Sequence, residues 1–262
     1  MGAEASTVST PHEELKQLAC GNGGPLAIFD WDDTLLPTSL LTGLGVRDGV
    51  PPGSDIAQAL ARHSYECGRM LQTVQKSARV VIVTAASPGW VQKSCALFLP
   101  DLLPVLATIP VFAARDFHGT VSPSSWESKA AAFEAILLAH AGADRRVNVV
   151  SVGDQPGDRK ALRAAKRSWG RRCVSKLVTV RQAEDITATT TQIRLLRRGI
   201  SDIIAHPTSL DLTIDLAQDA KSVFLPDTPP TSGSVTPIER PTEVLQLQKA
   251  LVWPLEEVTV CE

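Results

Sequence analysis

The sequence predicts an α/β fold built on a mostly parallel sheet with helices on both faces. Short runs rich in valine and isoleucine recur along the chain without polar alternation, which is typical of strands buried on both faces. Longer segments with helical periodicity separate these runs, and such alternation indicates a parallel, Rossmann-like sheet. The chain has 262 residues, enough to bury a sizeable core.

The apolar runs and periodic segments give the elements in order. A first helix is expected near Thr10, Pro11 and Glu13, which carry capping-box and first-turn signals. Strands are expected at residues 26–29, 79–84, 109–114, 147–153 and 174–180. Helices are expected at residues 55–77, 89–99, 129–140, 158–169 and 190–205, followed by the short alternating segment LDLTIDL.

Composition divides the chain into three parts. Residues 1–20 form an N-terminal arm with a short helix, and residues 21–217 hold the α/β pattern. Residues 218–262 include PDTPPTSGSVTPIERPT, whose proline, serine and threonine content predicts a disordered tail.

Charge and cysteine usage exclude several classes of protein. The formal net charge is −2, which gives no reason to expect a nucleic-acid partner. The five cysteines are scattered and never form a CxxC pair, which argues against a disulfide framework or a zinc knuckle and favours a reducing, cytoplasmic compartment. The apolar run at residues 95–114 contains Asp101 and three prolines, so it is expected to be helix, loop and strand, not a membrane span.

Polar residues follow the predicted strands where each strand ends. Asp30 and Asp32 follow the first strand, Thr84 ends the second, and Asp154 and Asp158 follow the fourth. The ligand crevice of an open parallel sheet lies beyond the carboxyl ends of its strands, so these side chains are expected to converge. Four acids in one place need a cation, and oxygen ligands without histidine or cysteine favour Mg²⁺.

Lys129, in the first turn of a predicted helix, completes a set of groups suited to a phosphate dianion. A metal ion and this lysine would cancel the charge of the phosphate, and Thr84 would donate a hydrogen bond to it. A carboxylate beside such a phosphate can attack phosphorus and form an aspartyl-phosphate, while a second carboxyl two residues later serves as acid and base.

These residues resemble the four ordered motifs of the haloacid dehalogenase (HAD) superfamily: DWDDT, the strand-ending Thr84, Lys129 and GDQPGD. The similarity covers residues 26–180. The sequence around these motifs most resembles uncharacterised HAD-like proteins of eukaryotic microbes, and this closer similarity does not identify a substrate. The resemblance implies Asp30 as nucleophile, Asp32 as general acid and base, and phosphate binding by Thr84 and Lys129. It also implies Mg²⁺ ligation by Asp30, the backbone carbonyl of Asp32, and Asp154, with Asp158 supporting or joining them.

The same resemblance predicts a phosphatase acting on a phosphorylated substrate. An aspartate at position 32 favours phosphatases and phosphomutases in this superfamily, and Asp33 stands where many members have glycine. Only about forty residues separate the first motif from the second strand, and a similar length follows Thr84. Neither gap holds a full cap domain, so the site is expected to be open to a bulky phosphoester or a phosphoprotein. The alternatives are a catalytically weak adaptor tethered to membranes and, less favoured because no lid excludes water, a phosphomutase.

The N-terminal residues MGAEAS match the N-myristoylation pattern, with Gly2 as acceptor and Ser6 in place. The competing interpretation is a chance match to a short pattern. A single myristoyl chain gives only marginal, reversible attachment. The expectation is a cytoplasmic protein with peripheral membrane contact. The sequence does not predict an oligomeric state.

Overall fold

The structure is a computed structural model that describes residues 11–19, 23–117, 124–142 and 146–214. The expectations for Gly2 and for the tail at residues 218–262 concern positions outside these described residues. No helix in the described ranges is both long and apolar enough to cross a membrane.

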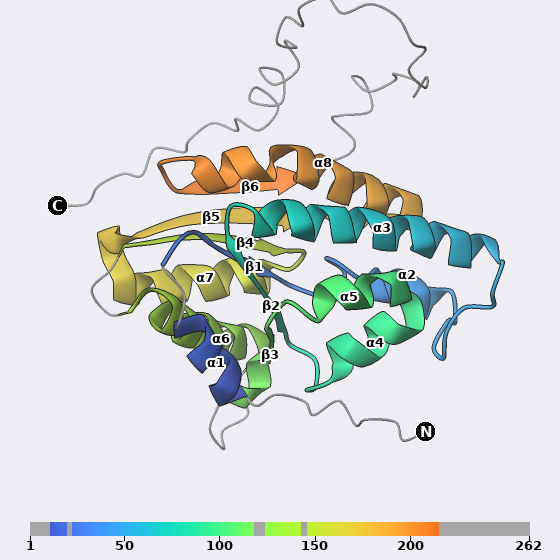
Figure 1. The fold of residues 1–262 in the computed structure, drawn as a ribbon, viewed down its shortest axis with the longest axis horizontal. Coiled ribbons are helices and arrows are strands. Elements are labelled where there is room, and N and C mark those ends of the chain that lie inside the picture. The colour runs from blue at the N-terminus through green and yellow to red at the C-terminus, as the bar shows by residue number, and fades with distance from the viewer. Residues whose placement is uncertain (1–10, 20–22, 118–123, 143–145, 215–262) are drawn as a thin grey trace, which may run out of the picture. The chain divides into compact units, whose positions relative to one another are not determined.

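Six strands form one sheet in which every neighbouring pair is parallel, as predicted (Figure 1). The spatial order is β3-β2-β1-β4-β5-β6. The strands are β1 (Leu26–Phe29), β2 (Arg79–Thr84), β3 (Val111–Ala113), β4 (Val147–Gly153), β5 (Cys173–Val180) and β6 (Leu210–Ile214). The strand β6 arises from the alternating segment LDLTIDL and pairs with β5 at one edge.

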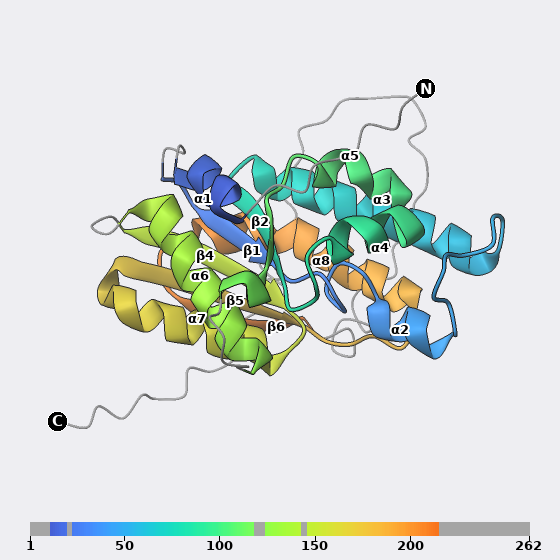
Figure 2. The ribbon, with the colours of Figure 1, turned by 90° about the horizontal axis from the view of Figure 1, so that it is seen from below.

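Helices cover both faces of the sheet (Figures 1 and 2). On one face lie α1 (Pro11–Ala19), α6 (Ser125–Ala141) and α7 (Pro156–Trp169). On the other lie α3 (Asp55–Gln75) and α8 (Ile186–Ala205), which pack against each other. Each helix turns an apolar face inward; in α3 the buried positions include Leu60, Cys67, Met70, Leu71 and Val74, at helical spacing.

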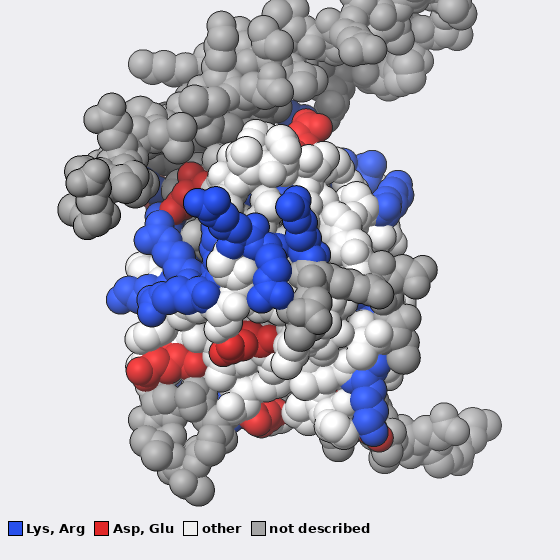
Figure 3. Space-filling model, turned by 90° about the vertical axis from the view of Figure 1, so that its left-hand side faces the viewer, with Lys and Arg blue, Asp and Glu red and all other residues white. Residues whose placement is uncertain are grey.

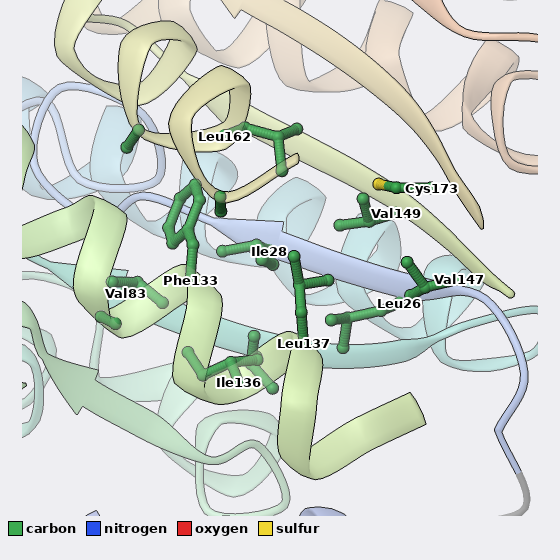
Figure 4. Packing of buried hydrophobic residues seen from close by; sticks show 14 of the residues in the cluster. Leu26, Ile28, Val83, Phe133, Ile136, Leu137, Val147, Val149, Leu162 and Cys173 are labelled. Carbon is green, nitrogen blue, oxygen red and sulfur yellow. The ribbon is translucent and has the colours of Figure 1, made fainter. Parts of the chain in front are cut away.

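One large cluster of buried side chains fills the space between the sheet and the layer of α6 and α7 (Figure 4). Leu26 and Ile28 of β1 meet Phe133 and Leu137 of α6, and Leu162 of α7 joins them. The central strand β1 is buried along its whole length. The polar residues that follow β1 therefore start from a fixed, well-packed support.

Several helix boundaries differ from the sequence predictions. The helix α6 begins at Ser125, four residues earlier than expected, because Ser124 and Glu127 form a capping box. Lys129 therefore lies beyond the first turn. The helix α8 begins at Ile186, since the side chain of Asp185 accepts a hydrogen bond from the backbone N–H of Ala188 at 2.7 Å.

The two segments that could have held a cap domain instead form helices of the α/β fold itself. Between β1 and β2 lie α2 (Thr38–Gly43) and α3, and between β2 and β3 lie α4 (Trp90–Phe98), the 3₁₀ turn η1 (Pro100–Leu102) and α5 (Leu103–Leu106). Gly89, at φ 79°, is the residue before α4, so this helix begins at Trp90, one residue later than expected. Short turns η2 (Ala114–Phe117) and η3 (Gly170–Arg172) complete the elements. The described residues contain no separate cap domain.

Candidate active site

The ends of two neighbouring strands, β1 and β4, bring three acidic side chains together at the carboxyl edge of the sheet. Asp30 follows β1 directly, and its backbone N–H donates to the carbonyl of Val152 at 2.9 Å, which fixes it beside β4. Asp154 follows β4, and Asp158 lies in the first turn of α7. Carboxylate oxygens of these three residues lie within 4.8 Å of one another. The predicted convergence of Asp30, Asp154 and Asp158 is thus present in the structure.

Lys129 reaches this cluster from α6 and bridges two of its acids. Its Nζ lies 2.6 Å from Asp30 Oδ2 and 2.6 Å from Asp158 Oδ1. The other oxygen of Asp30, Oδ1, accepts the backbone N–H of Trp31 at 2.8 Å. All three side chains of the bridge are buried, so the interaction is shielded from solvent and depends on its geometry.

The bridge holds two carboxyl groups and one ammonium, and its electrostatics reflect that imbalance. Burial and the neighbouring Asp158 raise the pKa of Asp30, and Lys129 only partly opposes them. Burial disfavours the charged form of Lys129, but Asp30 and Asp158 more than offset this, and its pKa is raised. Burial also raises the pKa of Asp154 to about 6. A proton, or a cation from outside the chain, stabilises this group of acids.

The cluster can hold a metal ion. Asp154 Oδ1 and Asp158 Oδ2 are buried and accept no hydrogen bond within the described part of the chain. Gly153 leaves room for the side chain of Asp158, because a Cβ at this position would lie 2.5 Å from Asp158 Oδ2. Unpaired, buried carboxylate oxygens are costly unless a cation or donor meets them. An all-oxygen donor set suits a hard divalent cation such as Mg²⁺.

The side chain of Asp32, predicted to be both acid/base and metal-site residue, is held apart from this cluster. Its Oδ1 accepts the Thr38 hydroxyl at 2.7 Å and the Trp90 indole N–H at 2.9 Å. Its Oδ2 accepts the Thr84 hydroxyl at 3.3 Å. The carboxylate is therefore fixed by three donors, and only its backbone remains to face a metal ion. Thr38 and Trp90 were not expected at the site from the sequence.

A tight loop after β1 produces this separation of Asp30 from Asp32. The carbonyl of Trp31 accepts the N–H groups of both Leu35 and Leu36 at 2.9 Å, which closes one helical turn. Asp33 has a positive φ of 55°, a conformation that glycine adopts without strain. Its carboxylate accepts the backbone N–H of Ser39 at 2.8 Å and so supports the start of α2. Asp33 thus has a local structural role outside the acidic cluster.

Two fully buried side chains, those of Trp31 and His63, also fix this loop. The Trp31 indole N–H donates to Ser94 Oγ at 2.9 Å. The His63 Nε2 lies 2.8 Å from the carbonyl of Leu35, and burial lowers the pKa of this histidine, which favours its neutral form. These contacts tie α3 and α4 to the segment that carries both aspartates.

A cavity of about 450 Å³ begins beside Thr84 and Ser87. It runs past apolar side chains of α4, α5 and β3 to Glu14 on α1, with Val91, Leu106, Ile109 and Val111 among its lining residues. Glu14 Oε2 is buried and has no hydrogen-bond partner in the described part of the chain, and burial raises the pKa of this carboxyl to about 7. The cavity offers space next to the site for more than a phosphate group.

Comparisons of the chain with protein-family models, with curated proteins and with solved structures found no match.

Proposed function

We propose that this protein is a Mg²⁺-dependent phosphatase of the HAD type, which hydrolyses a phosphomonoester through an aspartyl-phosphate intermediate on Asp30. The observation that carries the proposal is the buried bridge from Asp30 through Lys129 to Asp158, with Asp154 alongside. One anchored carboxylate, one lysine and two further acids at the strand ends are the groups that phosphoryl transfer to an aspartate requires.

In the first step an oxygen of Asp30 attacks phosphorus and the bond from phosphorus to the leaving oxygen breaks. The backbone N–H of Trp31 holds Asp30 Oδ1, which leaves Oδ2 as the attacking atom. Lys129, now paired with Oδ2, would turn to the phosphoryl oxygens as substrate arrives. The leaving oxygen takes its proton from the carboxyl of Asp32.

In the second step water attacks the phosphorus of the aspartyl-phosphate. Asp32 accepts the proton of this water, the bond from phosphorus to Asp30 breaks, and inorganic phosphate leaves. The three donors on Asp32 keep its carboxylate in one position through both steps. Thr84, which donates to Asp32 and accepts the backbone N–H of Ala86 at 3.0 Å, would also contact the phosphoryl group.

The residues that would hold Mg²⁺ are Asp30, Asp154 and Asp158, together with the backbone carbonyl of Asp32. When bound, the ion would neutralise phosphoryl charge and supply the positive charge that the buried acids lack. The remaining chemistry is that of the chain itself: Lys129 orients the phosphate, and the turn from Trp31 to Leu36 fixes the distance between nucleophile and acid.

The open surroundings favour a bulky phosphoester, including a phosphoprotein. The cavity that starts at Thr84 gives the leaving group a partly apolar space that extends to Glu14, whose Oε2 has no hydrogen-bond partner in the described part of the chain. A leaving group with an apolar body and a hydrogen-bond donor beyond it would fit these surroundings.

Release of phosphate from an aryl phosphate and from a panel of sugar, nucleotide and peptide phosphates tests the proposal. Activity should require Mg²⁺ and disappear on chelation. Asp30→Asn should lower kcat by on the order of 10⁴-fold or more, as loss of a nucleophile does, and Asp32→Asn by about 10²- to 10⁴-fold. Full turnover by Asp30→Asn would refute the mechanism. Absence of both Mg²⁺ binding and activity would favour the adaptor alternative.

A further inference from the structure

Basic residues crowd the end of α7 and the turn η3 without any acid among them. Between positions 159 and 172 the sequence RKALRAAKRSWGRR contains seven lysines and arginines and no aspartate or glutamate. The helix buries Ala161, Leu162, Ala165 and Trp169 against the core, so its cations point outward. Since the whole chain has a formal net charge of −2, this charge is strongly local.

The sheet brings one more cation to the same place. In the register of β4 and β5, Val147 lies opposite Cys173, so the residues before them, Arg146 and Arg172, lie at the amino ends of two neighbouring strands. The exposed and half-exposed cations at this end form what is called here the distal basic surface: Arg146, Arg163, Lys166, Arg167, Arg171 and Arg172. Figure 3 shows lysines and arginines gathered on this side of the molecule, with acidic side chains below them.

Within the part of the chain that the structure describes, only some of this charge is compensated. Arg163 pairs with Asp211 at 2.8 Å, and Asp211 is shared with Arg159. Lys166 donates to the hydroxyl of Ser209 at 3.0 Å, which carries no charge. Arg146, Arg167 and Arg171 have no acidic partner among the residues that the structure describes. Like charges held together without counter-charges create a strong local field that attracts anions.

We propose that the distal basic surface binds the anionic face of a lipid bilayer. The cations lie along one exposed helix side and a neighbouring turn, an arrangement that can contact many headgroups at once. The aromatic ring within this surface, Trp169, is buried beneath the guanidinium of Arg172, whose carbon Cζ lies 5.8 Å from the ring centroid. It therefore offers no free face for stacking bases, which single-stranded nucleic-acid sites use.

The position of the surface fits attachment without blockage of the candidate active site. The surface lies at the amino end of β4 and the acids lie at its carboxyl end, so the length of this strand, about 20 Å, separates them. The two functions are independent, and membrane binding does not rest on phosphatase activity.

The acyl chain expected on Gly2 would be a second contact with the bilayer. Alone it would give marginal binding, and a basic surface is the kind of second signal that makes attachment stable.

Sedimentation with vesicles tests the surface directly, using the full chain without an acyl group. The protein should sediment with vesicles of phosphatidylcholine and phosphatidylserine, should stay in solution with phosphatidylcholine alone, and should be released by salt. The variant Arg146→Gln/Arg167→Gln/Arg171→Gln should bind more than tenfold more weakly, since each basic residue near such a surface contributes about fivefold.

A matched variant removes three exposed cations elsewhere, on α3, α4 and α8: Arg62→Gln/Lys93→Gln/Arg198→Gln. It should bind the mixed vesicles as wild type does, and both variants should keep the wild-type melting temperature and phosphate release. An equal loss of binding in the two triple variants would overturn the proposal. So would tighter binding of a single-stranded RNA at the same phosphate concentration, which would identify a nucleic-acid surface instead.

Discussion

The two ends of β4 carry opposite charges, which are buried at the carboxyl end and exposed at the amino end. At the carboxyl end, Asp30, Asp158 and Lys129 are buried and joined by contacts of 2.6 Å. At the amino end, Arg146 and Arg171 are exposed and lack acidic partners within the described ranges. The helix α7 connects the two, with Asp158 in its first turn and Lys166 and Arg167 in its last, as its macrodipole favours.

The comparison teaches that the buried charges at the carboxyl end of β4 contribute to folding stability, whereas the exposed charges at its amino end are available to a partner. A buried charge that loses its partner costs folding free energy, whereas an exposed charge can be removed at little cost. The predictions below test this difference.

Removal of one cation from each end should have very different costs. Lys129→Met leaves Asp30 and Asp158 without their shared ammonium and should lower the free energy of unfolding by about 3–5 kcal/mol. Arg167→Met removes an exposed cation and should stay within about 0.5 kcal/mol. Denaturant unfolding with chelator measures both. Added Mg²⁺ should restore part of the stability of Lys129→Met, and similar losses in the two variants would contradict the comparison.

Replacement of single acids should distinguish an acid that binds the metal ion from an acid that pairs only with arginines of the protein. Asp154→Asn should weaken Mg²⁺ binding by about tenfold or more, because Asp154 Oδ1 is an unpartnered oxygen of the cluster. The rise in melting temperature with added Mg²⁺ measures it. Asp211→Asn, which changes an acid paired with Arg159 and Arg163, is the matched control and should keep the full rise. An unchanged rise in Asp154→Asn would rule out this cation site.

One hydrogen bond at the carboxyl end should affect catalysis more than folding. Trp90→Phe removes the indole N–H that donates to Asp32 Oδ1, so kcat should fall by about tenfold while KM changes little. Trp31→Phe also removes an indole N–H, but one that donates to Ser94 and not to a carboxylate. It should mainly lower the melting temperature, and a larger loss of kcat in Trp31→Phe than in Trp90→Phe would show that Trp90 does not position Asp32.

Glu14 has no cationic partner among the residues that the structure describes, so the stability of the protein should depend on the pH at which this carboxyl ionises. Its pKa is about 7 in the folded protein against an ordinary value of 4.5, so ionisation costs stability. The stability of wild type relative to Glu14→Gln should fall as pH rises from about 4.5 through 7 and then level off. The difference at high pH should be about 1 kcal/mol after allowance for partial exposure. A constant difference between pH 4 and pH 8 would contradict the raised pKa.

The sequence predicts the sheet and the position of the acids because these depend on local pattern. Apolar runs identify the buried strands, and in a parallel sheet the residues that follow them meet at one edge, as Asp30, Asp154 and Asp158 do. The metal-site role predicted for Asp32 concerns its backbone carbonyl and stays a prediction, while local pattern did not indicate that Thr38, Trp90 and Thr84 hold its side chain.

The remaining features depend on tertiary structure and could not be predicted from local pattern. Trp90 reaches Asp32 across 58 positions of sequence, through the packing of α4 beside the loop after β1. Arg146 and Arg172 come to the same end of the sheet because of the register of β4 and β5. The seven lysines and arginines between positions 159 and 172 can be read from the sequence. Acids elsewhere bring the formal net charge of the whole chain to −2, so the net charge does not indicate this local basic run.

The most direct measurement traps the aspartyl-phosphate after brief mixing with substrate and Mg²⁺. The reaction is quenched with acid and reduced with borohydride, which converts aspartyl-phosphate to homoserine with release of phosphate, and the peptides are then analysed by mass spectrometry. The account predicts a single acid-stable derivative on the peptide that contains Asp30, present in wild type and absent from Asp30→Asn. Robust turnover with no modification of Asp30, or with the phosphoryl group on another residue, would contradict it.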